Sequence, residues 1–173
     1  MSGDHLPFSI SDVPISEVER LQKAGFCGEA FSSLIRTKPT NLLLNARYTP
    51  KLASAIYNFE FRSDDIALVT YPKCGTTWMM EILWAMTHAD NLDPHSEEGR
   101  PMFLDRDFLM GTPKDENHPV LQKFRSLCPG GNPEDGIGHQ TAAATQGGRL
   151  ITSHLPLSHL NPTLIDTCKV SIV

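Results

Sequence analysis

The stretch from residue 66 to residue 89 constrains the fold of this chain more than any other part of the sequence. Its first five residues, IALVT, combine apolar and β-branched side chains directly after a polar turn. A short run of this kind predicts a buried strand. Residues 78–89 predict a helix, because their apolar side chains recur on one face. That face carries Trp78, Ile82, Ala85 and Met86.

The loop between this strand and this helix has the chemistry of a phosphate site. Gly75 lets the backbone approach a ligand, and the first free N–H groups of the helix point at the anion. Thr76 and Thr77 add hydroxyl donors, and Lys73 adds a positive charge. The Lys precedes the single Gly, unlike the order in the GxxxxGKS/T signature. From these residues alone, a phosphate loop and a plain strand-turn-helix connection are equally open.

Residues 64–78 closely resemble the strand and 5′-phosphosulfate loop of the cytosolic sulfotransferases. The usual family motif is TYPKSGTTW, and residues 70–78 read TYPKCGTTW. The resemblance implies an α/β fold with a P-loop-like parallel sheet flanked by helices. It also implies binding of 3′-phosphoadenylyl sulfate (PAPS), or of the product PAP, with Trp78 packed on the adenine. The residues assigned to the nucleotide are Lys73, Cys74, Gly75, Thr76, Thr77 and Trp78. A thiol is a poorer donor than the usual Ser hydroxyl, so Cys74 predicts weaker binding.

A second strand is predicted at residues 149–153, and His154, the candidate base, follows it directly. Ligands gather at the carboxyl ends of parallel strands, although a single His is more often an ordinary surface residue. Residues 149–156 read RLITSHLP and resemble the RLxKTHLP segment of the sulfotransferases. The resemblance implies that His154 is the catalytic base and that Lys73 stabilises the leaving group. The implied reaction transfers a sulfuryl group from PAPS to the hydroxyl of a phenol, an alcohol or a steroid-like acceptor, without a metal.

The predicted acceptor site rests on a few side chains. Phe103, Phe108 and Leu109 are apolar exceptions in a stretch rich in Pro, Gly, His and charge. They fit an apolar pocket and an ordinary core equally well. Thr152 and Ser153, which lie beside His154, complete the predicted substrate site.

Two departures from the family leave an alternative function open. Thr152 stands where the family has a Lys, and losing one such stabiliser typically costs on the order of 100- to 1,000-fold in rate. A third predicted strand begins at Lys169, and the sequence stops at Val173, before the Arg and Ser that clamp the 3′-phosphate in the family. The alternative is a truncated, weakly active or inactive fragment that binds PAPS or PAP. A P-loop phosphotransferase is disfavoured by the position of the Lys and the missing second Gly.

The length of 173 residues predicts a single domain. We divide it into an N-terminal segment at 1–60, a PAPS-binding strand-loop-helix at 61–89, a loop-rich acceptor region at 90–147, and a segment at 148–173 with the catalytic His and the third strand.

Four shorter segments carry more local predictions. Helices are predicted at residues 16–24, with a capping-box pattern from Ser16, and at 49–59, with a Pro at the first position. A short helix is predicted at 120–127. Residues 129–147 are expected to be weakly ordered.

Composition limits the remaining classes of function. The chain is 40% hydrophobic and 20% charged, which is typical of a globular protein, and its formal net charge of -5 disfavours a nucleic-acid partner. Residues 1–21 lack the pattern of an export signal, and no apolar run is long enough for a membrane span. Widely spaced cysteines predict free thiols in a cytoplasmic protein and no metal site. The oligomeric state cannot be predicted from the sequence.

Overall fold

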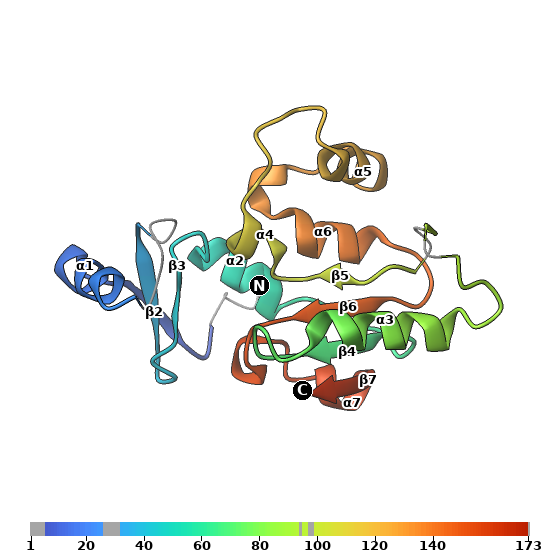
Figure 1. Cartoon of the computed structure of the whole chain (residues 1–173), viewed down its shortest axis with the longest axis horizontal. Helices are drawn as coiled ribbons and strands as arrows, with labels where there is room; N and C mark the ends of the chain where they lie inside the picture. The colour runs from blue at the N-terminus through green and yellow to red at the C-terminus, as the bar shows by residue number, and fades with distance from the viewer. Residues whose placement is uncertain (1–5, 26–31, 94, 97–98, 173) are drawn as a thin grey trace, which may run out of the picture.

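The computed structural model describes residues 6–25, 32–93, 95–96 and 99–172. These residues form two sheets (Figure 1). The first is antiparallel, with strand order β1-β2-β3, and the second is parallel, with strand order β5-β6-β4-β7. The strands are β1 (Ser9–Asp12), β2 (Leu34–Lys38), β3 (Leu43–Asn45), β4 (Ile66–Val69), β5 (Met102–Phe103), β6 (Leu150–Ser153) and β7 (Lys169–Ile172).

Most of the helices pack around the parallel sheet, whereas the first helix packs against the antiparallel sheet (Figure 1). The helices are α1 (Ile15–Lys23), α2 (Pro50–Tyr57), α3 (Thr76–Thr87), α4 (Arg106–Met110), α5 (Pro119–Leu127), α6 (Ile137–Ala144) and α7 (Leu164–Thr167). We call β1, β2, β3 and α1 together the N-terminal unit. Short 3-10 helices occupy Pro133–Asp135 and Leu157–His159. The N-terminal sheet and α1 lie to one side of the parallel sheet (Figure 1).

The three strands predicted from sequence are confirmed as neighbours in the parallel sheet. β4 lies between β6 and β7, and its register pairs Leu68 with Thr152 and Val69 with Ser153. The strands β4 and β6 are buried along their length, apart from the half-buried Ile66. Burial on both faces explains the unbroken apolar run of β4 in the sequence. The predicted α/β fold with a parallel sheet flanked by helices is therefore confirmed.

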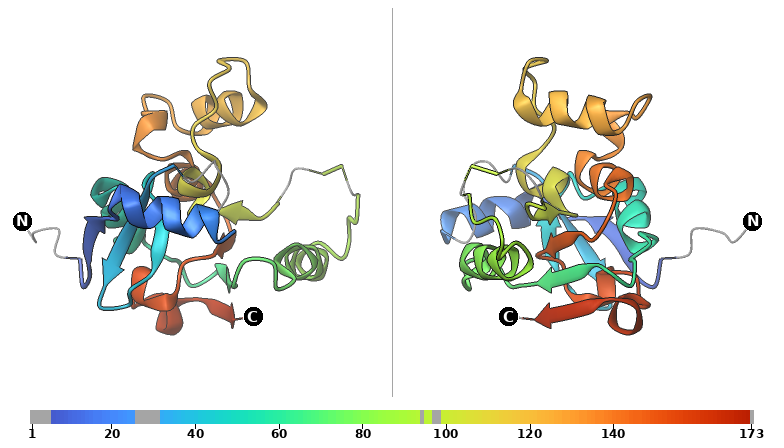
Figure 2. Two further views of the ribbon diagram at one scale, coloured as in Figure 1. Left: turned by 60° about the vertical axis from the view of Figure 1, so that its left-hand side comes forward. Right: turned by 90° about the vertical axis from the view of Figure 1, so that its right-hand side faces the viewer.

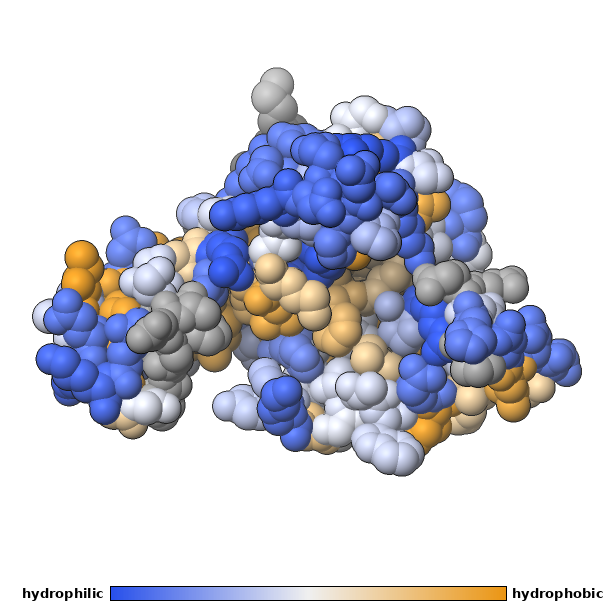
Figure 3. All heavy atoms as spheres, turned by 45° about the horizontal axis from the view of Figure 1, so that its top comes forward, coloured by the Kyte–Doolittle hydropathy of each residue, from blue (hydrophilic) through white to orange (hydrophobic). Residues whose placement is uncertain are grey.

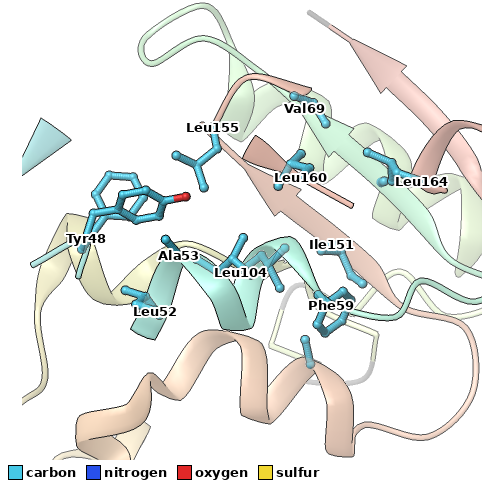
Figure 4. Packing of buried hydrophobic residues seen from close by; sticks show 14 of the residues in the cluster. Tyr48, Leu52, Ala53, Phe59, Val69, Leu104, Ile151, Leu155, Leu160 and Leu164 are labelled. Atoms are coloured by element: carbon cyan, nitrogen blue, oxygen red, sulfur yellow. The ribbon is translucent and has the colours of Figure 1, made fainter. Parts of the chain in front are cut away.

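The two faces of the parallel sheet pack against different helices. α2 and α6 cover one face and α3 covers the other (Figure 1, Figure 2). The main core lies on the α2 side, where Leu52 and Ala53 of α2 belong to one apolar cluster with Leu104 and Ile151 (Figure 4). Because strand side chains alternate, Leu68 and its neighbour Thr152 face the α3 side instead.

Helix α3 begins two residues earlier than predicted, and its apolar face points away from the core. Trp78, Ile82 and Met86 are 79%, 47% and 72% exposed. The helix packs through Thr76 and Trp84, both of which are buried. The sequence pattern correctly indicated one apolar face, but that face is not the buried one.

The N-terminal 60 residues contain an antiparallel sheet that the sequence did not predict. Helix α1 is confirmed, but the capping box is wrong, because the helix starts after Pro14 and has no side-chain cap. Helix α2 is confirmed, with Pro50 in its first turn and the Thr49 hydroxyl accepting from the N–H of Leu52 at 3.2 Å.

Residues 129–147 are more ordered than predicted. Helix α6 occupies 137–144, and its Gly138 approaches the carbonyl of Phe103 so closely that an added Cβ would lie 2.4 Å from it. The N–H of Gly138 donates to the buried Asp107 carboxylate at 2.9 Å. A glycine that suggested a loop therefore permits close packing of helix against strand. The helix predicted at 120–127 is confirmed as α5.

A buried histidine joins the N-terminal sheet to the rest of the molecule. His159 is fully buried, stacks on Phe8 with ring centroids 4.1 Å apart, and its Nε2 lies 3.1 Å from the hydroxyl of Thr37 in β2. Burial lowers the pKa of His159, so the ring is neutral near pH 7. His159 is therefore a core residue that no pattern in the sequence indicates.

A buried ion pair fixes the starts of β4 and β6. The Arg149 guanidinium donates to both carboxylate oxygens of Asp65, at 2.7 and 2.5 Å. It also donates to the carbonyls of Ala142 in α6 and Glu60. Both charged side chains are at most 1% exposed. One guanidinium thus ties two strands, a helix and the chain entering β4.

Replacing Arg149 with Met should lower the free energy of unfolding by about 3–5 kcal/mol, because it leaves the Asp65 carboxylate buried without its counter-charge. Urea unfolding followed by circular dichroism measures this loss. The double variant Arg149→Met, Asp65→Leu should recover part of it, since no buried charge is left unpaired. Equal urea midpoints for the wild type and Arg149→Met would contradict the assignment.

Candidate functional site

The loop between β4 and α3 has the backbone geometry of an anion cradle. Lys73 has φ 68° and Gly75 has φ 101°, so two residues of this short loop are left-handed. Such turns direct successive N–H groups to one side, where they join those at the start of α3. Lys73 is not a glycine, so its left-handed conformation carries backbone strain of the kind that gathers at binding loops.

Gly75 and Cys74 show how the loop is kept open. Nothing lies within 4 Å of a Cβ added to Gly75, so the glycine is required by its φ and the space beside it is available to a ligand. The thiol of Cys74 donates to the carbonyl of Tyr71 at 2.7 Å, inside the loop itself. Lys73, Cys74, Gly75 and Thr77 are all exposed.

Thr70 connects this loop to His154. Its hydroxyl lies 2.8 Å from the hydroxyl of Thr76 at the start of α3 and 3.1 Å from Nδ1 of His154. The carbonyl of Thr70 lies 3.0 Å from the same Nδ1. The parallel register brings about this meeting, because Thr70 follows β4 and His154 follows β6.

The contact with the Thr70 carbonyl favours one tautomer of His154. Because a carbonyl oxygen only accepts, we assign the proton of the neutral ring to Nδ1, which then donates to Thr70. In the neutral ring Nε2 then has the free lone pair. The histidine has the form that a general base requires, with the available nitrogen on the side of the ring opposite Thr70.

A buried carboxylate holds the backbone at His154. Oδ2 of Asp105 accepts from the backbone N–H of His154 at 2.6 Å and from the hydroxyl of Ser153 at 3.0 Å. Its other oxygen, Oδ1, has no hydrogen-bond partner among the described residues. Burial raises the pKa of Asp105, and the hydrogen bonds from His154 and Ser153 only partly offset this. Burial and then the charge of Asp105 raise the pKa of Tyr48.

An apolar pocket of about 370 Å³ lies beside His154 and the phosphate loop. The pocket lies between the N-terminal unit and the parallel sheet, and its lining comes from both. Figure 3 shows apolar side chains gathered in the hollow between these two parts. The pocket is lined by Leu21, Leu34, Leu42, Leu43, Leu44, Asn45, Tyr71, Pro72, Phe108, Leu109 and His154. A volume of this size is in the range of small-molecule sites.

The predicted substrate residues occupy different places. Phe108 lines the pocket, whereas Phe103 lines a separate cavity of about 220 Å³ and contacts His154 with ring centroids 5.5 Å apart. Thr152 is fully buried, and its hydroxyl has no partner among the described residues. The hydroxyl of Ser153 is bonded to Asp105 and to the N–H of Leu155. Neither Thr152 nor Ser153 lines the pocket.

Trp78 lies on the outer face of α3, where it is 79% exposed. Its indole is therefore accessible beside the phosphate loop. An exposed aromatic at the first turn of this helix is available for stacking on a flat ligand.

Sequence reasoning missed two residues of the site. Thr70 lies inside the recognised loop motif, but its hydrogen bonds to both neighbours depend on the strand register. Asp105 had one signal, a carboxylate directly after the apolar pair at 103–104. Leu104 is fully buried, so an acid beside it is placed where ionisation is costly.

Neither a metal-binding cluster of side chains nor a membrane-spanning helix is found among the described residues. The described part of the chain contains no group of three His, Cys, Asp or Glu side chains arranged to hold a metal ion. Among the same residues, no helix has both the length and the hydropathy needed to cross a bilayer. Cys74, Cys128 and Cys168 are free thiols, whereas Cys27 lies outside the described residues.

Comparison with known proteins gives a consistent result. Residues 63–173 match the family model of the sulfotransferase domain. Sulfotransferase 1A1 of Mus musculus is 30% identical over 130 residues, covering 73% of this chain and 36% of the relative. Cytosolic sulfotransferase 6 of Arabidopsis thaliana is 26% identical over 128 residues, covering 71% and 34%. The chain thus spans about a third of the length of the curated relatives it matches.

Solved structures share the fold. A retinol dehydratase in complex with retinol and PAP has a TM-score of 0.62 at 20% identity, covering 96% of this chain and 51% of that chain. The same enzyme in complex with androsterone and PAP has a TM-score of 0.66 at 21% identity, covering 96% and 50%. At this identity the comparison establishes the fold and the placement of this chain in about half of it.

Replacing Asp105 with Asn should stabilise the protein near pH 7. Because the folded-state pKa of Asp105 is raised above 3.8, the wild type loses stability as the pH rises from about 4 through that raised value. Asn keeps an acceptor for His154 and Ser153 without the buried charge, so we expect a gain on the order of 1 kcal/mol or more at neutral pH. Thermal unfolding of both proteins between pH 4 and pH 8 measures the difference, which should shrink at the acidic end. A lower melting temperature for Asp105→Asn at pH 7 would contradict this.

Proposed function

Because this chain belongs to the sulfotransferase family, we propose that it holds PAPS on the loop at 70–78 and presents an acceptor hydroxyl to His154. The observation that carries this proposal is the double contact of Thr70, with Thr76 at 2.8 Å and with His154 at 3.0 and 3.1 Å. The contact supports the proposal because it joins His154, which lines the apolar pocket, to the loop at 70–78.

The donor side would be held by backbone and side chains together. The N–H groups at residues 75–77, where α3 begins, suit the 5′-phosphate and sulfate oxygens, whereas the N–H of Cys74 already donates to the carbonyl of Tyr71 at 3.3 Å. The charge of Lys73 suits the oxygen that becomes negative as PAP leaves. Trp78, exposed on α3, is placed to pack on the adenine. Bound PAPS would supply the activated sulfuryl group.

The acceptor side would use the pocket and His154. The acceptor hydroxyl gives its proton to Nε2 of His154 as its oxygen bonds to sulfur, and the bond from sulfur to the phosphate oxygen breaks. Nδ1–H stays on the Thr70 carbonyl, which keeps the ring aligned through the transfer. Asp105 anchors the backbone of the same residue. Phe108 borders the acceptor, and Phe103 supports the His154 ring from outside the pocket.

A second candidate function is binding of PAPS or PAP with little or no turnover. Thr152 favours it, because the family's Lys position here holds a buried neutral hydroxyl that brings no charge to the sulfuryl oxygens. This residue lies on the α3 side of the sheet, the side of the phosphate helix. The two candidates share the phosphate loop and differ only in the rate of the chemical step.

We assign the four segments at 1–60, 61–89, 90–147 and 148–173 to the N-terminal portion of a single sulfotransferase domain. One apolar cluster supports this, since it joins Phe8 near the start of the chain to Ile151 in β6 and Leu164 in α7. The acceptor is a small hydroxyl compound, and no nucleic-acid partner is proposed for a chain of net charge -5. The resemblance to cytosolic relatives favours a cytoplasmic location.

Replacing Lys73 with Met should weaken PAP binding roughly 10- to 100-fold, the value of one hydrogen bond to a charged group. Isothermal titration calorimetry with PAP measures the affinity. Lys114→Met is the matched control, because Lys114 is also an exposed lysine but lies outside the site. Unchanged affinity in Lys73→Met would remove this side chain from the nucleotide site.

Replacing His154 with Ala should lower sulfuryl transfer from radiolabelled PAPS to a phenol by roughly 100- to 10,000-fold, because the general base is lost. PAP affinity should stay within about twofold, the expected result for a residue that contacts the acceptor. His95→Ala, at an exposed histidine, serves as the control. Transfer at an unchanged rate would assign the proton to another group. PAP binding by the wild type without transfer would favour the second candidate.

A further inference from the structure

We propose that the pocket beside His154 selects a neutral, largely saturated alcohol that carries a second oxygen atom, and that Asn45 binds this second oxygen. The inference rests on the proposed function, which assigns this pocket to the acceptor. It names the chemical class of that acceptor and one residue that recognises it.

The wall of the pocket is aliphatic. Leu21 comes from α1, Leu34 from β2, and residues 42–44 add three more leucines from the turn and β3. Leu109 of α4 lies in the same lining. Branched aliphatic side chains offer a rounded apolar surface, which contacts the puckered rings of a saturated compound well.

Aromatic stacking is confined to one part of this pocket. Phe108 is only 5% exposed, and its ring already packs edge-on against Tyr48 with centroids 5.4 Å apart. Tyr71, in the phosphate loop, is 77% exposed and, apart from His154, is the other aromatic residue in the described lining. A flat phenol would therefore find the extra energy of a ring pair only beside the phosphate loop, whereas the rest of the wall is aliphatic.

Charge is absent from the described lining, which contains no Asp, Glu, Lys or Arg. A charged acceptor entering an apolar site without a counter-charge loses its hydration and gains no partner. The lining thus disfavours both carboxylate and ammonium groups on the acceptor. A neutral molecule avoids this cost.

Asn45 supplies a fixed hydrogen-bond donor. Its Oδ1 accepts from the backbone N–H of Arg47 at 2.9 Å, and this contact determines which end of the amide is oxygen. The amide nitrogen has no protein partner among the described residues. A ketone, ether or hydroxyl oxygen on the acceptor can accept from it, and a hydrocarbon cannot.

Binding to the 173-residue chain tests the proposal without requiring turnover. Equilibrium dialysis in the presence of PAP would compare three radiolabelled probes with rigid saturated skeletons. Androsterone is an alcohol with a distant ketone, androstanol lacks the ketone, and lithocholate carries a carboxylate. We expect androsterone to bind roughly 3- to 10-fold more tightly than androstanol, the value of one neutral hydrogen bond. Lithocholate should bind more weakly than either.

Asn45→Asp is the informative variant, because its carboxylate still accepts from the N–H of Arg47 but has no N–H to donate. It should abolish the preference for androsterone over androstanol, as should Asn45→Leu. PAP affinity within twofold of the wild type verifies that each variant is folded. The wild-type comparison of the three probes stands even if a variant does not fold.

Several results would overturn the proposal. They are equal binding of androsterone and androstanol by the wild type, a ketone preference that survives in Asn45→Asp, and lithocholate binding as tight as that of androsterone. If PAP binds but none of the probes does, the pocket inference fails and the nucleotide site stands. If the ketone preference appears but PAP does not bind, the pocket inference stands and the proposed nucleotide site fails.

Discussion

The buried ion pair between Arg149 and Asp65 is the constraint on which the rest of this structure depends. It joins the residues directly before β4 and β6 with two hydrogen bonds, and the same guanidinium donates to the carbonyl of Ala142 in the last turn of α6. Pairing the starts of two parallel strands also aligns their ends. The carboxyl ends of these strands lead into the phosphate loop and His154. An interaction at the amino ends of the two strands therefore sets the geometry at their carboxyl ends.

Thr70 is the counterpart of that ion pair at the functional edge. One residue contacts the first helical residue of α3 through its hydroxyl and His154 through its hydroxyl and carbonyl. Asp105 then fixes the His154 backbone from the other side. The charge of Arg149 is balanced by the carboxylate of Asp65, whereas Asp105 has one carboxylate oxygen, Oδ1, without a hydrogen-bond partner among the described residues. The structure thus tolerates an unfavourable buried group beside the proposed base, as is common at functional sites.

The elements that were predicted correctly from the sequence are those with a clear local pattern, which does not depend on contacts with distant parts of the chain. The apolar run of β4, the loop motif at 70–78 and the amphipathic α5 are of this kind. The sheet formed by β1, β2 and β3 was missed because β1 is mostly exposed, β3 is only three half-buried residues long, and the turn between β2 and β3 carries no clear signal. Helix α6 was missed because its glycine serves close packing. The exposed face of α3 and the role of Asp105 follow only from the positions of other elements, which periodicity does not contain.

Five of the six leucines that line the pocket belong to the N-terminal unit, which is separate from the sheet that carries Lys73 and His154. β2, β3 and α1 supply most of the wall and Asn45, while Thr70, Lys73 and His154 extend from the parallel sheet. The two parts meet through the core and through His159. Because of this division, the shape of the pocket can change in evolution without a change in the residues at the ends of β4 and β6. Substitutions in the three-stranded sheet can reshape the cavity without changing Thr70, Lys73 and His154, the residues proposed for nucleotide binding and proton transfer.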